Sequence, residues 1–365
     1  MAKDISALLR QDVIAGVFEG IKPGFPTALP SGFYQVSKRE MAAADGMFTY
    51  DKVEGTRKVA RTIRYNGKSA VRNVSGVDTI PVKALFSAEH LDFDVAKLIN
   101  LRGLGNGNVQ EGIAMQEINR RLAEARQLQQ NLRNASVHLS LLDGILYRDV
   151  EGNLLPSSVG AVYTTDWAIP AGNKDQITDS AGSTIIDAKW STAATDIIGH
   201  VNKIKSRALD QTGYPLKYAI YGPNILGNVM GNTAAVNLMQ SSPVFNSGII
   251  ESGEFPNPFL GLTWIRGDQF FWSDNDGTIR RPVGADDVVF LPEPDPSWYD
   301  LVETSYLWTD KEGVAMNMND ITLKMGPSIQ MKIESDPVTA SAIYRDAFLP
   351  TINVPAAIFI ADTNP

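Results

Sequence analysis

The spacing of apolar residues predicts a long α-helix over residues 108–142. Its apolar positions recur at steps of three and four residues, which places them on one helix face. These positions are Ile118, Leu122, Ala125, Leu128, Leu132, Ala135, Leu139 and Leu142. The other faces carry charged side chains, including Glu117, Arg120, Arg121, Glu124, Arg126 and Arg133. At about 1.5 Å per residue, the predicted helix is about 50 Å long.

A shorter amphipathic helix is predicted over residues 4–18. Its apolar stripe consists of Ile5, Leu8, Leu9, Val13, Ile14, Val17 and Phe18. Two interpretations fit the stripe: a helix docked on its own domain, or a terminal arm docked on a neighbouring subunit. Because residues 20–32 are rich in Gly and Pro and form an extended linker, we favour the arm.

Two hairpins are predicted in the first half of the chain. Residues 51–83 have few apolar side chains, and we expect a projecting hairpin that turns at Asn66-Gly67. Residues 145–159 form the second predicted hairpin, directly after the long helix.

The second half of the chain mixes helix and strand signals. Residues 192–210 predict a helix that ends at Gly213, and residues 216–221 predict a strand, with a further helix starting at Pro223. This order indicates a small α/β domain.

Alternating apolar residues near the C-terminus predict further strands. Residues 321–333 predict a long two-stranded ribbon around Gly326-Pro327. The segment 349–360 predicts one more buried strand, interrupted by Pro355.

Composition excludes several kinds of chemistry. The 365 residues, 44% of them hydrophobic, are enough for one large or two ordinary domains. The absence of Cys excludes disulfides, thiolate metal sites and cysteine nucleophiles, and only three His are present. We expect no targeting or membrane-spanning segment. A net charge of −8 argues against a protein that coats nucleic acid.

The net charge conceals two windows of opposite sign. Residues 51–83 carry eight Lys or Arg against three acidic residues, a charge of +5. Residues 282–310 carry seven acidic residues and no Lys or Arg, a charge of −7. The two windows are either solvated faces or surfaces that meet, within one chain or between copies.

No motif supports catalysis. Gly103–Gly107 lacks the Lys-Ser/Thr of a phosphate-binding loop and predicts a hinge, while Asp274–Gly277 and Arg266–Asp268 predict turns. His200 has no partner at metal-ligand spacing and predicts a surface or satisfied core histidine. Carboxylate pairs such as Asp286/Asp287 are expected in polar turns, where burial would not raise a pKa.

Several segments resemble the major capsid proteins of tailed bacteriophages, which have the Hong Kong 97 fold, and most closely the lambda-type (E) family. They are the long helix 108–142 with the hairpin 145–159, the stretch Tyr214–Pro223, Asp336-Pro337, the stretch Tyr344–Pro350 and the closing Pro355–Asp362.

The resemblance implies an α+β fold with four parts. These are an N-terminal arm (1–45), an extended loop formed by a β-hairpin (46–85), a peripheral domain (86–187 and 304–345) with the spine helix 108–142, and an axial α/β domain (188–303 and 346–365).

The resemblance also implies a function and partners. The chain is expected to assemble with itself, as hexamers and pentamers, into an icosahedral virion shell built in the host bacterial cytoplasm. The shell encloses double-stranded DNA without sequence-specific binding. A separate scaffolding protein, a portal and a decoration or cement protein are expected partners, with no cofactor, metal or membrane. The chain lacks a long helical scaffolding domain and an identifiable Lys–Asn pair for covalent cross-linking.

Inter-subunit contacts are expected between the two charge windows. We hypothesise that the basic residues lie over a neighbour's acidic surface: Arg57, Lys58, Arg61, Arg64 and Lys68 against Asp286, Asp287, Glu293 and Asp295. An encapsulin-type bacterial nanocompartment shell and a soluble enzyme of another class are the alternatives.

Overall fold

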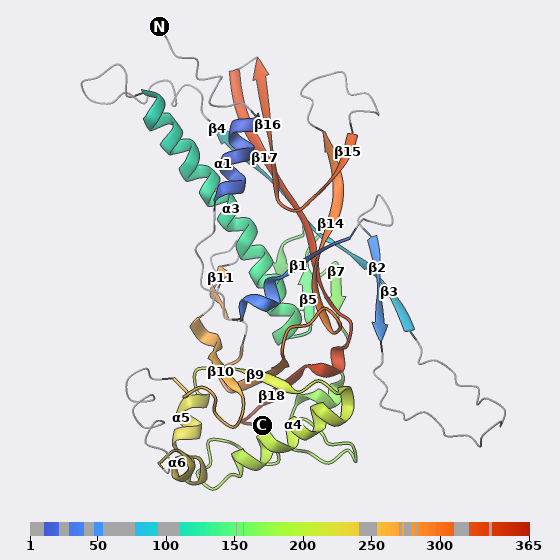
Figure 1. Cartoon of the computed structure of the whole chain (residues 1–365), viewed down its shortest axis with the longest axis vertical. Coiled ribbons are helices and arrows are strands. Elements are labelled where there is room, and N and C mark those ends of the chain that lie inside the picture. The colour runs from blue at the N-terminus through green and yellow to red at the C-terminus, as the bar shows by residue number, and fades with distance from the viewer. Residues whose placement is uncertain are drawn as a thin grey trace, which may run out of the picture.

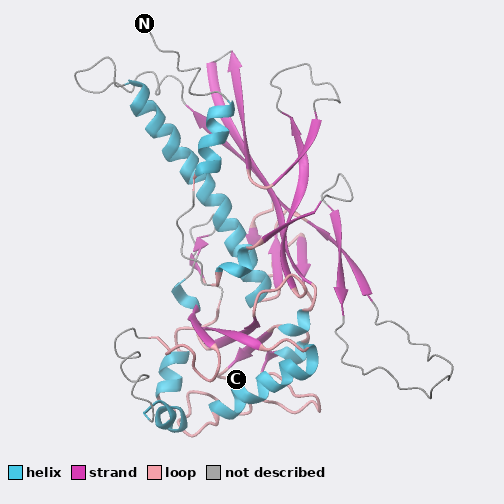
Figure 2. Cartoon of the chain, in the orientation of Figure 1, coloured by secondary structure: helices cyan, strands magenta, loops and turns pink. Residues whose placement is uncertain are grey.

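The computed structural model describes most of the chain around one long helix and two sheets (Figure 1). The described residues are 11–21, 29–39, 47–53, 77–93, 110–150, 152–155, 157–240, 254–269, 272–273, 279–281, 283–309, 321–335 and 338–365. Helices and strands are both abundant (Figure 2), which confirms the α+β class. No helix within these ranges is long and apolar enough to span a membrane.

Helix α3, Gln110–Leu142, runs along the long axis of the molecule and confirms the predicted long helix. Residues 108 and 109, the start of the predicted helix, lie outside the described residues. Arg120 pairs with Glu124 and Arg121 pairs with Glu117, as i,i+4 spacing suggests. The apolar stripe is buried at Ile118, Leu122, Ala125, Ala135 and Leu142, whereas Leu128 is 53% exposed.

The C-terminal half of α3 is buried on its polar side as well. Gln129, Arg133, Asn134, Ser136, His138 and Ser140 are all buried. The sequence pattern places these residues outside the apolar stripe. Their burial follows from tertiary packing, because this half of the helix lies in the interior of the chain.

A six-stranded sheet lies against α3. Its strands are β1 (Val36–Arg39), β4 (Leu85–Phe93), β14 (Tyr299–Thr309), β15 (Ile321–Met325), β16 (Ser328–Ser335) and β17 (Val338–Ile352). The central strand β17 pairs with β4 on one edge, and with β16 and then β14 on the other.

The predicted two-stranded ribbon over 321–333 is wrong. Strand β15 pairs with β14, and β16 pairs with β17. The turn at Gly326-Pro327 therefore carries the chain from one strand pair to another. Alternating apolar residues identify strands, but they do not identify their partners.

Helix α1, Gln11–Gly20, packs on the same chain, so these residues differ from the expected neighbour-docking arm. Ile14 and Phe18 are buried in one cluster with Ile118 and Leu122 of α3 and Met331 of β16. Residues 1–10, the first part of the predicted helix, lie outside the described residues.

A five-stranded sheet forms the second layer, at the C-terminal end of α3 (Figure 1). Its order is β10 (Thr263–Arg266), β9 (Leu216–Tyr221), β13 (Asp287–Pro292), β18 (Phe359–Asp362) and β8 (Lys174–Asp175). Helices α4 (Ile197–Thr212), α5 (Ile225–Met230) and α6 (Thr233–Gln240) accompany it.

The elements predicted for this layer are present, but α4 begins at Ile197 instead of residue 192, and α5 begins at Ile225 instead of Pro223. Asp196 caps α4 by accepting from the Gly199 N–H, and Gly213 ends the helix at a φ of 86°. Strand β9 has the predicted bounds, and α5 follows Pro223.

Three small sheets complete the described fold. They are β2 (Met47–Val53) with β3 (Val77–Lys83), β5 (Ile145–Arg148) with β6 (Leu154–Leu155) and β7 (Tyr163–Asp166), and β11 (Trp272–Ser273) with β12 (Ile279–Arg280). The pairing of β5 with β6 confirms the second predicted hairpin. The strands β2 and β3 are antiparallel, but the predicted turn at Asn66-Gly67 lies outside the described residues.

Short 3₁₀ segments lie at Ser31–Tyr34, Ala171–Asn173, Gly267–Gln269 and Pro355–Ala357. The last of these divides the predicted C-terminal strand 349–360, so that its two parts belong to different sheets.

Candidate functional site

A buried ionic cluster joins α3 to the six-stranded sheet, and we call it the Arg133 cluster (Arg133, Glu303 and Asp346). The Arg133 Nε and Nη2 atoms donate to the two Asp346 carboxylate oxygens at 2.6 and 2.7 Å. Nη2 also lies 2.7 Å from Oε1 of Glu303. The side chains of Arg133, Glu303 and Asp346 are only 9%, 8% and 1% exposed. The guanidinium thus holds one carboxylate from each of two strands.

The electrostatics of this cluster favour the charged form of Arg133. Burial lowers the pKa of Arg133, but the hydrogen bond to Asp346 and the nearby charges outweigh it and raise the pKa overall. The guanidinium also lies over the Phe348 ring, 5.1 Å from its centroid. Arg126, two turns before Arg133 on the same face of α3, is half-buried, and burial together with the charge of Arg133 lowers its pKa.

The Arg133 cluster lies between two apolar clusters along α3. One contains Ile118, Leu122 and Ala125, and the other contains Val137 and Leu141. Between them, the contacts from helix to sheet include the charged hydrogen bonds of Arg133. Charged hydrogen bonds are directional, so this part of the interface fixes the orientation of the helix more narrowly than apolar packing does.

The acidic residues predicted as contact sites lie at opposite ends of β13. Asp286 and Asp287 are half-buried at its start, whereas Glu293 and Asp295 are exposed beyond its end. At about 3.3 Å per residue, Asp287 and Glu293 are about 20 Å apart along the strand. The structure therefore places the four predicted acidic contact residues on two separate surfaces, and Asp300 and Glu303 of the same window are buried.

The expectation that burial would not raise the pKa of these carboxylates is wrong for Asp287. Burial raises the pKa of Asp287, and the Asp362 carboxylate raises it further. Asp362 is the residue directly opposite on β18, and Asp175 lies on the next strand, β8. The sequence could not show this crowding, because the three carboxylates are far apart along the chain.

The other acidic surface is partly neutralised by its own chain. Lys217 lies 3.8 Å from the carboxylate of Glu293, with both side chains exposed. The Asp295 carboxylate accepts the Ser297 N–H at 2.8 Å, and hydrogen bonding at Ser297 lowers the pKa of Asp295. Asp295 thus stabilises the turn before β14.

The predicted basic contact residues Arg57, Lys58, Arg61, Arg64 and Lys68 lie outside the described residues. The strands before and after them are β2 and β3, which pair only with each other among the described strands.

The histidines do not form a metal site within the described residues, where no group of three potential ligands was found. His200 is buried; its Nδ1 accepts the Trp190 indole N–H at 3.2 Å, and its Nε2 lies 3.0 Å from Asp187. This confirms the prediction of a satisfied core histidine. His138 is fully buried in α3, and burial lowers its pKa to about 4. His90 is exposed on β4.

The remaining sequence motifs have structural roles or lie outside the described residues. Arg266 pairs with Asp268 at 2.6 Å within the predicted turn. The strands beside Asp274–Gly277 pair as a hairpin, although that turn and Gly103–Gly107 themselves are not described.

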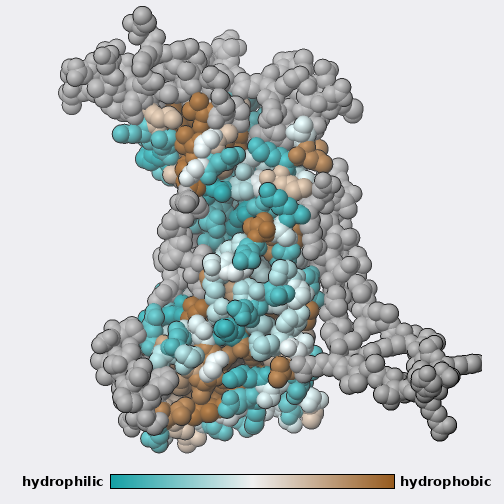
Figure 3. All heavy atoms as spheres, viewed as in Figure 1, coloured by the Kyte–Doolittle hydropathy of each residue, from teal (hydrophilic) through white to brown (hydrophobic). Residues whose placement is uncertain are grey.

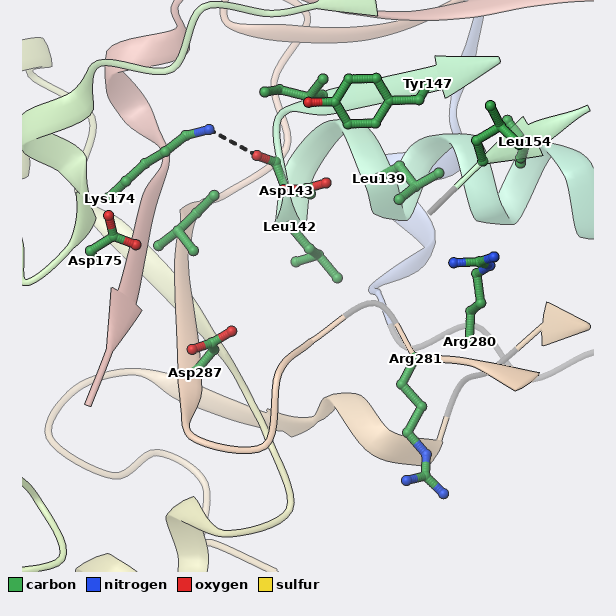
Figure 4. Close-up of a pocket in the computed structure, with 13 residues that line it drawn as sticks. Leu139, Leu142, Asp143, Tyr147, Leu154, Lys174, Asp175, Arg280, Arg281 and Asp287 are labelled. Carbon is green, nitrogen blue, oxygen red and sulfur yellow. Dashed lines mark hydrogen bonds between the residues drawn. The ribbon is translucent and has the colours of Figure 1, made fainter. Parts of the chain in front are cut away.

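A cavity of about 490 Å³ lies where the end of α3 meets the five-stranded sheet (Figure 4). Its wall combines apolar side chains such as Leu139 and Leu142 with charges of both signs. Lys174 donates to the Asp143 backbone carbonyl at 3.0 Å, and burial raises the pKa of the Asp143 carboxyl. Mixed charges without a nucleophile–base pair give this cavity no recognisable catalytic arrangement.

On the face seen in Figure 3, exposed apolar side chains of the described residues lie in separate patches. One patch is a cross-strand pair, Leu307 on β14 and Leu323 on β15, which are 58% and 61% exposed. Val150, Val159 and Val162, near the β5–β7 sheet, are also exposed. Scattered exposed apolar residues of this kind are normal on protein surfaces and by themselves indicate no contact site.

Comparisons with known proteins identify similar solved structures only. No family model and no curated protein sequence matches the chain. A putative prophage capsid protein from Escherichia coli CFT073 is 17% identical over 78% of this chain and 79% of that one, with a TM-score of 0.48. A phage-related protein from Bordetella bronchiseptica RB50 is 11% identical over 96% of both chains, with a TM-score of 0.45. An encapsulin from Synechococcus elongatus PCC 7942 is 9% identical over 100% of this chain and 96% of that one, with a TM-score of 0.40.

Proposed function

We propose that the chain is the major capsid protein of a tailed double-stranded DNA bacteriophage, a non-catalytic subunit that assembles into an icosahedral head shell. One observation carries the proposal. A long helix laid along a six-stranded sheet, a β2–β3 pair separate from both main sheets and an α/β layer occur in one chain. They follow in the order expected for the Hong Kong 97 fold.

In this proposal the chain has four parts. Residues 1–45 are the N-terminal arm, 46–85 the extended loop, 86–187 with 304–345 the peripheral domain, and 188–303 with 346–365 the axial domain. With these bounds, Arg133 belongs to the peripheral domain, whereas Glu303 and Asp346 lie at the ends of the two axial segments, so the Arg133 cluster joins the two domains.

The main partner of the chain is the chain itself, as hexamers and pentamers in the virion shell. A separate scaffolding protein, a portal and a decoration or cement protein complete the assembly in the host bacterial cytoplasm. The net charge of −8 suits a container, because an inner wall that repels DNA allows the packaged molecule to slide.

We further propose that the basic residues of the extended loop, including Arg61 and Arg64, contact the acidic surface at the start of β13 in a neighbouring copy. This surface concentrates Asp286, Asp287 and Asp362, whereas Glu293 already has Lys217 nearby. Each exposed ion pair contributes about 0–1 kcal/mol, but a shell repeats it in every subunit.

Negative-stain electron microscopy of the purified chain, alone and with a scaffolding protein, tests the function. Closed shells or capsomers of hexamer size are expected. A 39.8 kDa monomer that never assembles would contradict the proposal. Shells filled with a cargo enzyme instead of DNA in the native host would indicate an encapsulin.

Charge reversal tests the proposed contact. The double variant R61E/R64E is expected to form few or no shells. The matched control K189E/K203E reverses two exposed lysines outside the basic window and is expected to assemble normally. Intact R61E/R64E shells of normal stability would refute the contact and leave the shell function standing.

A further inference from the structure

The six-stranded sheet divides into two ribbons near the middle of β17. Along one edge, β17 pairs with β16 as far as Arg345 and with β14 from Phe348 onward. Strand β14 pairs with β17 from Tyr299 to Glu303, and then with β15 from Ser305 onward. We call the point of division the sheet fork, and its two branches the β16 ribbon (β4, β16 and β17) and the β15 ribbon (β14 from Ser305, with β15). The branches diverge visibly in Figure 1.

The Arg133 cluster spans the sheet fork. Asp346 belongs to the β16 ribbon, and Glu303 is the last β14 residue paired with β17 before the β15 ribbon begins. Arg133 binds both carboxylates from the spine helix. The backbone pairing between β14 and β17 ends at this level, so side-chain contacts connect the branches beyond it.

Other contacts at the sheet fork support the same geometry. Tyr306 donates from its hydroxyl to the Gly326 carbonyl at 2.8 Å and also contacts Ser328, at the crossing between the branches. Gly326 has a φ of 76°, and a Cβ there would lie 3.0 Å from Oε2 of Glu303. The crossing turn therefore packs directly on the Arg133 cluster.

Apolar packing holds the two branches unequally. The β16 ribbon contributes Ile329, Met331 and Tyr344 to the apolar cluster under α1 and α3. Within the described residues, the β15 ribbon contributes only Tyr306 to a buried apolar cluster, with Ala347 as its partner. Its Leu307–Leu323 pair is exposed. Among the side chains that the structure describes, apolar packing thus holds the β16 ribbon more extensively than the β15 ribbon.

We propose that the Arg133 cluster is a clasp that sets the angle between the two ribbons, with Arg133 as its positioning residue. The planar guanidinium bonds both Asp346 oxygens and Glu303 at once, which fixes distance and direction together. Release of the clasp allows the β15 ribbon, with its exposed leucine pair, to turn about the sheet fork. This inference concerns the single chain and does not depend on the proposed shell.

A distance measurement across the fork tests the clasp. The chain has no native Cys, so T322C on β15 and K332C on β16 give two unique, exposed labelling sites. Pulsed electron–electron double resonance then measures the distance between nitroxide labels on the two branches. The labelled full-length chain is diluted with unlabelled chain so that distances within one chain dominate. One narrow distribution is expected with Arg133 in place.

In the labelled chain, R133M is expected to shift the distribution or to broaden it at least about twofold, because two ribbon angles become accessible. The control R120M removes an exposed arginine from the same helix and is expected to change nothing. A folded R133M chain with the original narrow distance would overturn the proposal.

A second variant keeps the test decisive where R133M does not fold. The triple variant R133M/E303L/D346L removes both buried carboxylates, so no charge is left without a partner. It is expected to fold and still to give the shifted or broad distribution. An unchanged narrow distance in this variant would show that ribbon packing alone sets the angle, and the clasp would be refuted.

Discussion

Replacement of Arg133 by Met gives the most direct measure of how the spine helix is held on the sheet. The change retains much of the side-chain length but removes the guanidinium. It leaves Asp346 and Glu303, 1% and 8% exposed, without their hydrogen-bonded cation. Removal of one partner from a buried ion pair costs about 3–5 kcal/mol, because the remaining charge is buried and uncompensated. We expect R133M to lose stability in this range.

Urea unfolding of the unassembled chain, followed by tryptophan fluorescence, measures this loss. The free energy of unfolding is compared among the parent, R133M, R120M and the triple apolar variant. Arg120 is exposed and pairs only with Glu117 and Glu124 on its own helix, so R120M is expected to unfold as the parent does.

The triple apolar variant is expected to recover most of the stability lost in R133M. Well-packed apolar residues can replace a buried ionic network at little cost, because no charge then has to be desolvated. The reasoning would be refuted if R133M lost less than about 1 kcal/mol, the range of an exposed ion pair. It would also fail if the triple variant were no more stable than R133M.

Three further predictions concern other buried groups. F18A removes a ring on the buried face of α1 that is only 1% exposed, and it is expected to lower the free energy of unfolding by about 3–5 kcal/mol or to release α1 locally. Local release would be detected as faster amide hydrogen exchange over residues 13–20. Unchanged exchange and stability would contradict the packing of α1 on its own chain. His138 is neutral in the fold because burial lowers its pKa from 6.5 to about 4. The unfolded chain therefore takes up a proton at His138 between pH 6.5 and 4, and the free energy of unfolding falls by about 3 kcal/mol as the pH is lowered through this range. In H138Q this pH dependence of the free energy of unfolding is expected to be absent. D287N is expected to raise the midpoint of unfolding above that of the parent at pH 7, because it relieves the repulsion between Asp287 and Asp362. The difference is expected to disappear at a pH where the Asp287 carboxyl of the parent is protonated. Equal midpoints at pH 7 would refute the repulsion.

Elements defined by neighbouring residues could be predicted from the sequence. Helix α4 follows from an apolar face and a terminal Gly213, although its start at the Asp196 cap was not predicted, and β9 follows from six residues between turn signals. The 33-residue helix α3 follows from its repeat of apolar positions. Each of these signals lies within one short window, where backbone preference and the core-facing side decide the outcome.

Pairing between distant segments could not be predicted in the same way. The alternation around Gly326-Pro327 identifies two strands, but it is equally compatible with a hairpin and with a crossing between two ribbons. The structure shows the crossing, because β15 finds β14 and β16 finds β17. Partner choice depends on which edges are free after the rest of the sheet forms, and that information is not local.

The sequence by itself determined the α+β class, the long helix and the positions of several strands, together with the two windows of opposite charge. Only the tertiary structure decided which charges act together. Arg133 is one more charged residue beside an apolar stripe until the fold brings Glu303 and Asp346 to it from 170 and 213 residues away. Asp287 is an ordinary turn carboxylate until β18 places Asp362 opposite. A charge acquires its energy from its burial and its neighbours, and both are properties of the folded chain.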